Sequence, residues 1–363
     1  MKKISLRTKL EAVFIMIICI ILVSAGALSV TRTISDTHDD VETFIRNSNG
    51  NYWEATGENI QNAIDDVAFP QIIQGVFPLG VPYCTVTLPS GINFSISSTI
   101  IIGPLIMLDL GGSTIKPTGN FNVAKLDDAS QVRNGVIDVS GVDGYSSAAI
   151  CFDKDINFQA HINLVEKLNL VSANQSGIGI YINVSSNEAQ VISGVYFDNV
   201  RIDSFEYGIF FNHSSTKDPA SGYNSYMNGN YFSNIRIINT TYCIKMFSIS
   251  TQGGGTAGGG YETTGNFFDN IYCYCTNKTE SIIWHDGWYI TGMSYNNIYA
   301  IGWDNNSGTR IAYNFTARAY LYLSFSGGGN DVALPVWSQW DNPYMVINRD
   351  TSTLMLGKLL EYR

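Results

Sequence analysis

The stretch Val191–Ile202, VISGVYFDNVRI, decides the fold, because the chain repeats its second half three more times. The first copy is Tyr196–Ile202, and the later ones are Tyr231–Ile237, Phe267–Cys273 and Ser294–Ala300. Each copy has an asparagine at its fourth position, and these asparagines are 35, 36 and 27 residues apart. Alternate residues within each copy are apolar, which indicates a β-strand rather than a helix.

A repeat of roughly 30 residues, built on one strand and its turns, predicts a coil of stacked rungs. Weaker copies at 133–138 and 165–170 extend the pattern upstream. We therefore predict an all-β fold, a right-handed parallel β-helix in which each rung covers the apolar side of the next at about 4.8 Å. The alternative is a β-sandwich, but sandwich strands recur every ~8–12 residues and rarely repeat their sequence.

The coil predicts two columns of equivalent side chains. One is an inward aliphatic column, formed by Val200, Ile235, Ile271 and Ile298. Beside it, at a turn, we expect a ladder of hydrogen-bonded asparagines, formed by Asn199, Asn234, Asn270 and Asn297.

The composition suits many strands and tight turns. Of the 363 residues, 45% are hydrophobic and 14% charged, and there are 34 glycines and 21 tyrosines. The first 12 residues carry a net charge of +3, so the rest of the chain carries −13. Nucleic acid and anionic lipid headgroups both favour basic surfaces, so neither is an expected partner of this acidic body.

The N-terminus has the pattern of a secretory signal or a membrane anchor. Residues 1–12 are basic, and residues 13–30 carry no charge. A short apolar core followed by Ala25-Gly26-Ala27 fits a cleaved signal peptide, whereas 18 uncharged residues can just span a bilayer. Both interpretations place the body outside the cytoplasm. We predict a signal or anchor at 1–31, a linker or stalk at 32–55 and a β-helix domain at 56–363.

A short amphipathic helix is expected before the first rungs. Ile60, Ala63, Ile64 and Val67 recur at helical spacing, and such a helix would cap the open end of the coil. Asp65 and Asp66 are interpreted as part of its solvated face and not as a catalytic pair.

The opening of the chain resembles the pectate-lyase superfamily of β-helix proteins. The residues that carry the resemblance are ENIQNAIDDV at 58–67, VTLPSG and NFSISSTI between 86 and 100, and LDLGGSTIKP at 108–117. The polygalacturonase-like and phage-tailspike-like members are the nearest in pattern. The resemblance implies the fold and a polysaccharide substrate, but the repeats lack the catalytic motifs of polygalacturonases and the arginine pattern of calcium-dependent pectate lyases.

Candidate catalytic residues therefore come from the repeat itself. Asp198 and Asp269 hold the same repeat position with Ser233 between them, which predicts carboxylates about 9–10 Å apart. That is near the upper limit for an inverting glycosidase pair. Solvated turn acids are the structural alternative.

Candidate substrate-binding residues lie in the most aromatic predicted loop, Trp284–Tyr289, and at Trp303. Flat rings beside carboxylates suit stacking on sugars, and packing inside the coil is the alternative. The residues named for this role are Trp284, His285, Asp286, Trp288, Tyr289 and Trp303.

Other polar motifs are less specific. Eight sequons are candidate glycosylation sites or ordinary turn residues: Asn93, Asn174, Asn183, Asn212, Asn239, Asn277, Asn305 and Asn314. The five cysteines outside the leader are expected to be small buried residues, and no spacing indicates a metal site. No cofactor is expected.

Two functions remain open from the sequence. The first is an exported or anchored cell-surface β-helix that engages polysaccharide, with cleavage by a lyase or hydrolase reaction as its stronger form. The second is a non-catalytic structural or adhesive surface protein, which would form homo-oligomers.

Overall fold

A computed structural model describes residues 44–67, 84–154, 156, 163–185, 190–214, 225–248, 261–287, 290–291, 293–302, 313–315, 321–325, 336–338 and 345–349. The chain has two compact units, Met1–Val41 and Glu42–Arg363, and the described residues all belong to the second. The predicted signal or anchor at 1–31 lies outside them. Among the helices that the structure describes, none has the length and apolar character to cross a bilayer.

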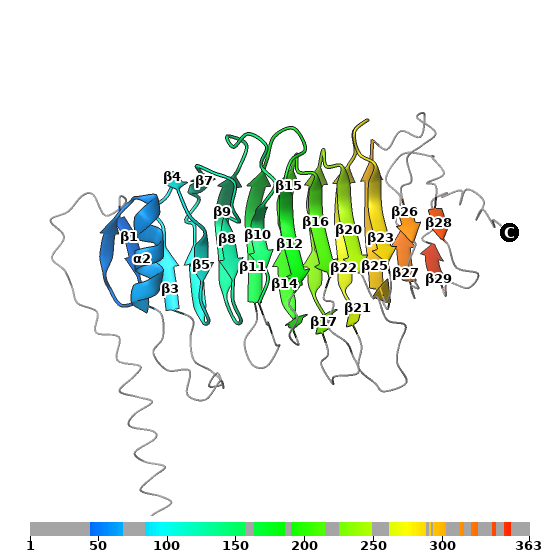
Figure 1. The fold of residues 1–363 in the computed structure, drawn as a ribbon, viewed down its shortest axis with the longest axis horizontal. Helices are drawn as coiled ribbons and strands as arrows, with labels where there is room; N and C mark the ends of the chain where they lie inside the picture. Colours follow the sequence, from blue (N-terminus) through cyan, green and yellow to red (C-terminus); the bar gives the residue numbers. More distant parts are fainter. Residues whose placement is uncertain are drawn as a thin grey trace, which may run out of the picture. The chain divides into compact units, whose positions relative to one another are not determined.

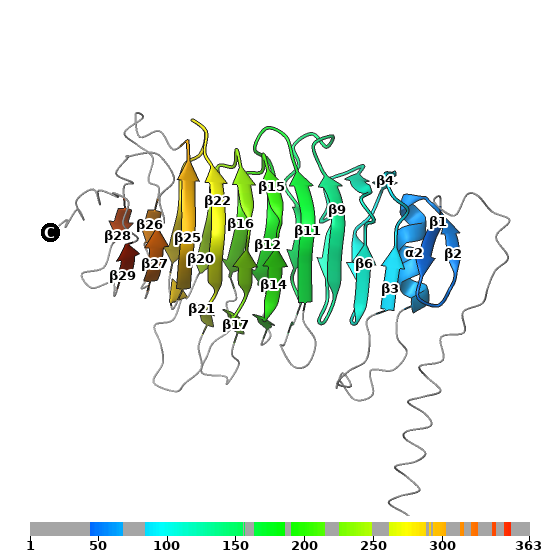
Figure 2. The ribbon, with the colours of Figure 1, turned by 180° about the vertical axis from the view of Figure 1, so that it is seen from behind.

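The described unit is all-β apart from one helix, and its strands lie mostly parallel in three sheets (Figures 1 and 2). Sheet A contains, among others, β3 (Cys84–Thr87), β6 (Ile106–Asp109), β9 (Gln131–Asp138), β11 (Asn163–Val171), β14 (Val195–Asp198), β18 (Tyr231–Ser233), β22 (Phe267–Tyr274), β25 (Met293–Ile301), β27 (Leu321–Phe325) and β29 (Met345–Arg349). Also in sheet A are β4 (Asn93–Ile96), β7 (Thr114–Pro117), β15 (Arg201–Asp203) and β19 (Arg236–Ile238).

Sheets B and C hold the remaining parallel strands. Sheet B contains β5 (Ile100–Ile102), β8 (Ala124–Leu126), β10 (Ala148–Phe152), β12 (Ile178–Val184), β16 (Tyr207–His213), β20 (Tyr242–Ser248), β23 (Ser281–Gly287), β26 (Tyr313–Phe315) and β28 (Val336–Ser338). Sheet C contains β13 (Val191–Ser193), β17 (Ser225–Asn228), β21 (Tyr261–Thr264) and β24 (Ile290–Thr291).

The chain visits the three sheets in a repeating order. After β14 and β15 in sheet A it passes through β16 in sheet B and β17 in sheet C, and it then returns to sheet A as β18. The same order follows for β18 to β22 and for β22 to β25. Parallel sheets visited in this order are compatible with a β-helix.

Sheet A contains the predicted aliphatic column and the column of asparagines, but the asparagine ladder is mixed with aspartates: Asn270 Nδ2 donates to Asn234 Oδ1 at 2.9 Å, whereas Asn234 and Asn297 donate to aspartates. Arg201, Arg236 and Tyr272 are register partners, as are Ile271 and Ile298, so the residues of the aliphatic column follow one another along the sheet. All four members are buried: Val200, Ile235, Ile271 and Ile298. The ladder asparagines have left-handed φ values of 53°, 56°, 61° and 53°, in the order Asn199, Asn234, Asn270 and Asn297. Asparagine tolerates this conformation better than most residues, which explains why the turn repeats it.

The core lies between the inner faces of sheets A and B. Buried rings of successive sheet A strands stack with their centres 4.4, 4.7 and 4.9 Å apart, in the order Phe197, Phe232, Phe268 and Tyr295. From sheet B, Phe152 meets Phe197 and Phe211 meets Phe232, each with ring centres 5.7 Å apart and edge to face. Such pairs add stability beyond the area that they bury.

The predicted amphipathic helix is confirmed as α2 (Gly57–Val67), whose buried residues are Ile60, Ala63, Ile64 and Val67. It packs against the first strands of the described unit, at the blue end of the ribbon in Figure 1. The second half of the predicted linker at 32–55 is folded in the structure and is not a linker. There β1 (Phe44–Asn47) and β2 (Tyr52–Glu54) form an antiparallel hairpin, and β1 also pairs antiparallel with β3. The folded body therefore begins before residue 56.

Asp66 ties this hairpin to the helix. Its carboxylate accepts hydrogen bonds from the side-chain amides of Asn51 at 2.7 Å, Asn47 at 2.8 Å and Asn49 at 3.5 Å. The bonds from Asn47 and Asn51 hold the pKa of Asp66 below its ordinary value. Asp66 is thus a structural anchor, in agreement with the interpretation that it is not catalytic.

Replacing Asp66 with alanine is expected to loosen residues 44–54 without unfolding the sheets. Hydrogen exchange at the β1 amides should accelerate several-fold, because the three asparagine amides lose their shared acceptor. Asp65→Ala is the matched control, since Asp65 accepts a bond within the helix, from Gln61 at 2.8 Å. Equal exchange in the two variants would contradict the anchoring role.

Candidate functional site

The two candidate catalytic aspartates lie in one column of sheet A. Asp198 pairs with Ser233, and Ser233 pairs with Asp269, so the carboxylates are two strands apart. Each one accepts a hydrogen bond from a ladder asparagine. Asn234 Nδ2 donates to Asp198 at 2.8 Å, and Asn297 Nδ2 donates to Asp269 at 3.1 Å. Both acids therefore hold the turn in place, which is a structural task.

The aromatic segment Trp284–Tyr289 begins as a strand and not as the predicted loop. Strand β23 pairs with β20 as far as Gly287, so its side chains alternate between the two faces of sheet B. Trp284 and Asp286 are half-buried on the outer face, whereas His285 is fully buried on the inner face. His285 therefore cannot touch a glycan, and its predicted binding role is wrong. The other candidates lie outside the described residues: Trp288, Tyr289 and Trp303.

Trp284 belongs to a group of rings around one lysine on the outer face of sheet B. Lys245 in β20 is the register partner of Trp284. The ammonium nitrogen of Lys245 lies 4.7 Å from the ring centre of Tyr242, 5.2 Å from that of Tyr207 and 6.0 Å from that of Trp284. These distances are within the range of cation–π attraction, about 6 Å. We call Tyr207, Tyr242, Lys245 and Trp284 the lysine–aromatic cluster.

The rings of this cluster differ in orientation. Tyr207 and Tyr242 stack with centres 5.4 Å apart and planes 11° from parallel. The Trp284 ring is turned by 89° from Tyr242, at a centre distance of 5.7 Å. Stacked rings hide their faces from solvent. Trp284 stands outside the stack, so no ring of the cluster lies flat against its faces.

Two glutamates border the cluster. The Tyr242 hydroxyl donates a hydrogen bond to the Glu280 carboxylate. Burial, followed by the interaction with Glu280, raises the pKa of Tyr242, and burial together with Glu206 raises the pKa of Tyr207. Both phenols therefore remain protonated hydrogen-bond donors at neutral pH. The cluster thus combines one cation with three aromatic rings, and two carboxylates lie at its border.

The polar surface continues along β16 and β12. Phe210 stacks on Tyr207 at 4.8 Å and on Tyr181 at 5.5 Å. The Tyr181 hydroxyl donates to Asn183 Oδ1 at 3.0 Å, and Asn212 Nδ2 donates to the same oxygen at 2.8 Å. Aromatic rings thus lie on four adjacent strands of sheet B, and on β12 and β16 amides lie beside them.

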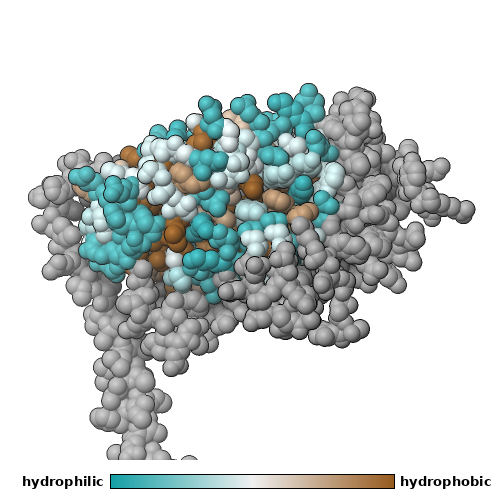
Figure 3. Space-filling model, viewed as in Figure 1, coloured by the Kyte–Doolittle hydropathy of each residue, from teal (hydrophilic) through white to brown (hydrophobic). Residues whose placement is uncertain are grey.

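This surface is suited to a flat, hydroxyl-rich ligand. Aromatic faces pack on the apolar faces of sugar rings, and amides and carboxylates bond to the hydroxyl groups. On the face shown in Figure 3, hydrophobic residues form only separate patches among hydrophilic ones. The sequence shows the same spacing of three residues twice, from Tyr207 to Phe210 and from Tyr242 to Lys245. Their convergence was missed because it depends on the register between β16 and β20.

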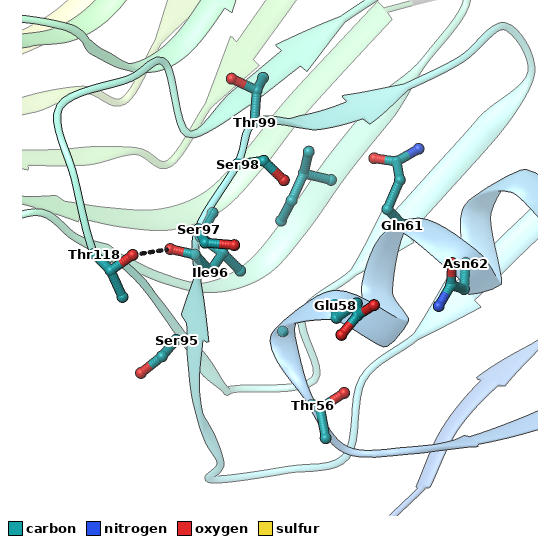
Figure 4. A pocket seen from close by; sticks show the side chains of 12 residues that line it. Thr56, Glu58, Gln61, Asn62, Ser95, Ile96, Ser97, Ser98, Thr99 and Thr118 are labelled. Atoms are coloured by element: carbon teal, nitrogen blue, oxygen red, sulfur yellow. Dashed lines mark hydrogen bonds between the residues drawn. The ribbon is translucent and has the colours of Figure 1, made fainter.

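A polar pocket of about 710 Å³ lies beside α2 (Figure 4). Its lining is rich in hydroxyl groups, and Glu58 is its one acidic side chain. Gln61 at its edge accepts from the backbone N–H of Ile101 at 2.8 Å and donates to the Ile101 carbonyl at 3.2 Å, which ties α2 to β5. The pocket lacks aromatic rings and offers no nucleophile paired with a base.

Histidines of the described region face the interior. His285 Nε2 lies 2.6 Å from the Tyr295 hydroxyl, and Thr263 Oγ1 lies 3.4 Å from His213 Nδ1. Burial lowers the pKa of His213 to about 4 and that of His285 to about 3. Both rings are neutral at pH 7 and enclosed, so they are structural groups.

The sequons fall into two groups. The amides of Asn183, Asn212 and Asn239 are engaged along the stack, for instance Asn239 Nδ2 with Ser204 Oγ at 3.1 Å. By contrast, Asn93, Asn174 and Asn277 are exposed, so an added glycan would break no stack bond there. The side chains of Asn305 and Asn314 are outside the described part of the chain.

The cysteines agree with the expectation of small buried residues. Cys151, Cys243, Cys273 and Cys275 are buried and Cys84 is half-buried, and no disulfide joins any of these five described cysteines. Within the described residues, no group of three or more histidine, cysteine or acidic side chains is arranged to hold a metal ion.

The lysine–aromatic cluster is thus the part of the described surface with the most chemistry suited to a ligand. Comparisons of the chain with protein-family models, with curated proteins and with solved structures found no match.

Proposed function

We propose that this chain is a right-handed parallel β-helix of the pectate-lyase type, exported or anchored at the cell surface, that binds polysaccharide through the lysine–aromatic cluster. The repeating order of sheets A, B and C, the left-handed asparagines and the capping helix support the fold. The basic and apolar N-terminus supports the location. The arrangement of Lys245 and three rings beside Glu206 and Glu280 carries the binding function.

The ligand is a polysaccharide or surface glycan with several sugars in contact. Successive strands of a sheet are about 4.8 Å apart, so the four strands β12, β16, β20 and β23 together span about the length of three sugar units. A chain lying across them would meet the amides of Asn183 and Asn212 at one end and Trp284 at the other. The glutamates and Lys245 then bond to its hydroxyl groups.

Trp284→Ala is expected to weaken glycan binding about tenfold, because Trp284 is the ring of the cluster that lies outside the tyrosine stack. Affinity electrophoresis or a glycan array with pectin, alginate and surface glycans measures this directly. Tyr231→Ala is the matched control. Tyr231 is also a partly exposed aromatic residue, but on the outer face of sheet A it lies between Tyr196 at 4.7 Å and Phe267 at 4.8 Å. Loss of binding in both variants, or in neither, would contradict the assignment of glycan binding to the lysine–aromatic cluster.

We expect binding without cleavage. The carboxylates of Asp198 and Asp269 each accept a ladder amide, and Ser233 stands between them. Incubation with the bound glycan should therefore release no reducing ends. Release that disappears in Asp198→Asn or Asp269→Asn would establish a hydrolase or lyase instead.

A second candidate is a structural or adhesive protein that assembles through sheet A. Tyr231 and Phe267 are 37% and 39% exposed, and together with Tyr196 they form an aromatic strip. Sedimentation of the ectodomain decides this candidate. Oligomers that dissociate in Tyr231→Ser would favour it, and a monomer would dismiss it.

A further inference from the structure

Three thiols meet in the core between sheets A and B. Cys243 lies in β20, Cys273 lies in β22, and Cys275 follows β22. They are 1%, 0% and 9% exposed. Side-chain hydrogen bonds with Cys273 and Cys275 lower the pKa of Cys243, and the bond with Cys243, followed by burial, raises the pKa of Cys273. The thiols therefore belong to opposite walls of the core and touch each other.

The neighbouring rungs explain why cysteines stand here. Position for position, Gly179, Gly208, Cys243 and Ile282 follow one another along sheet B. Opposite them along sheet A are Ile202, Ile237, Cys273 and Ala300. At one end of this series the larger residue is in sheet A, where Ile202 faces Gly179. At the other end it is in sheet B, where Ile282 faces Ala300. Cys243 and Cys273, which are of intermediate size, lie between these two arrangements.

The two walls come unusually close at this column. A Cβ placed on Gly179 would lie 2.5 Å from Ile202 Cγ2, and one placed on Gly208 would lie 2.8 Å from Ile237 Cγ2. Disulfides need Cβ atoms about 3.5–4.5 Å apart, which only a close approach of the walls permits. The next rung brings the Cys243 and Cys273 thiols into contact in the same column.

We propose that Cys243 and Cys273 form a disulfide between sheets B and A when the chain folds under oxidising conditions. Cys243, as the thiolate, attacks a disulfide oxidant such as oxidised glutathione, and the oxidant releases one thiol. Cys273 then loses its proton and displaces the second thiol, so the S–S bond forms as the oxidant takes up the two electrons. Cys275 remains reduced. The inference relies on the core geometry, and the proposed export would supply the oxidising compartment.

Refolding of the reduced full chain in a glutathione redox buffer tests this without reference to export or glycan binding. After blocking with N-ethylmaleimide, trypsin followed by chymotrypsin separates the three cysteines, because cleavage at Tyr274 divides Cys273 from Cys275. Mass spectrometry should then show one peptide pair, Cys243 linked to Cys273, with the other four cysteines of the full chain blocked: Cys19, Cys84, Cys151 and Cys275. Six blocked thiols, or a link from Cys243 to Cys275, would overturn the proposal.

A double variant that copies the residues of the neighbouring rung provides the control for folding. Cys243→Ile combined with Cys273→Ala copies the Ile282 and Ala300 pair and should fold without either thiol. The melting temperature of the native chain should exceed that of this variant by several degrees in oxidising buffer, and the excess should vanish in reducing buffer. An equal difference in both buffers would show that the cysteines act by packing alone.

Discussion

Lowering the pH from 7.5 to 5 is expected to remove about 4 kcal/mol from the free energy of unfolding. The cause is the pair of buried histidines, His213 and His285, whose pKa values are about 4 and about 3 in the folded chain. An unfolded histidine titrates near 6.5, so between these values the unfolded chain binds more protons than the folded one. Stability is therefore complete above pH 6.5 and falls as the pH drops.

The magnitude follows from the two shifts. At pH 5 an unfolded histidine is mostly protonated while both folded histidines remain neutral, which costs about 2 kcal/mol for each of them. The loss continues until the pH passes the folded pKa values, near 4 for His213 and near 3 for His285. Tyr295, which shares a hydrogen bond with His285, does not titrate in this window, because burial raises its pKa.

Urea unfolding at pH 7.5 and pH 5.0, followed by tryptophan fluorescence, measures this loss. His285→Gln keeps a polar atom near the Nε2 position and His213→Asn keeps one near Nδ1, but neither variant titrates. Each should lose about half of the pH dependence, and the double variant nearly all of it, whatever its stability at pH 7.5. A double variant with the native slope would show that other groups are responsible.

The stacking of the repeat could be predicted because it depends only on the period of the repeat and on the alternation of apolar and polar residues within each copy. Equivalent residues such as Val200 and Ile235 become neighbours in any coil with that period, and the asparagine turn repeats because few residues accept its left-handed φ. The helix α2 was predictable for the same reason, since its buried face recurs at helical spacing.

The sequence does not show as clearly on which face of sheet B each side chain lies. In β23 the aromatic Trp284 is followed directly by the polar His285, so hydropathy does not reveal that Trp284 points outward and His285 inward. The lysine–aromatic cluster has a different obstacle. Tyr207 and Tyr242 are 35 residues apart, and their meeting with Lys245 depends on the register between strands, which the variable loops of each rung conceal.

Gly208→Ala is expected to destabilise the fold by about 2–4 kcal/mol, although alanine normally suits a strand better than glycine. The backbone φ of Gly208 is ordinary, so the effect comes from space alone. A Cβ there would lie 2.6 Å from the carbonyl oxygen of Cys243 on the next strand and 2.8 Å from Ile237 Cγ2. Cβ atoms do not approach other atoms so closely without displacing them.

The carbonyl contact makes this prediction specific. If Ile237 alone were in the way, Ile237→Ala would open the space and rescue Gly208→Ala. Because the Cys243 carbonyl belongs to the sheet B backbone, we expect the double variant to be less stable than either single one. Gly103→Ala is the matched control, since its Cβ would meet Ile106 Cδ1 at an ordinary 3.5 Å. Urea unfolding at pH 7.5 ranks the four variants. Full rescue by Ile237→Ala would mean that the two strands are not held together at Gly208, and the close stacking of β16 on β20 would then be wrong.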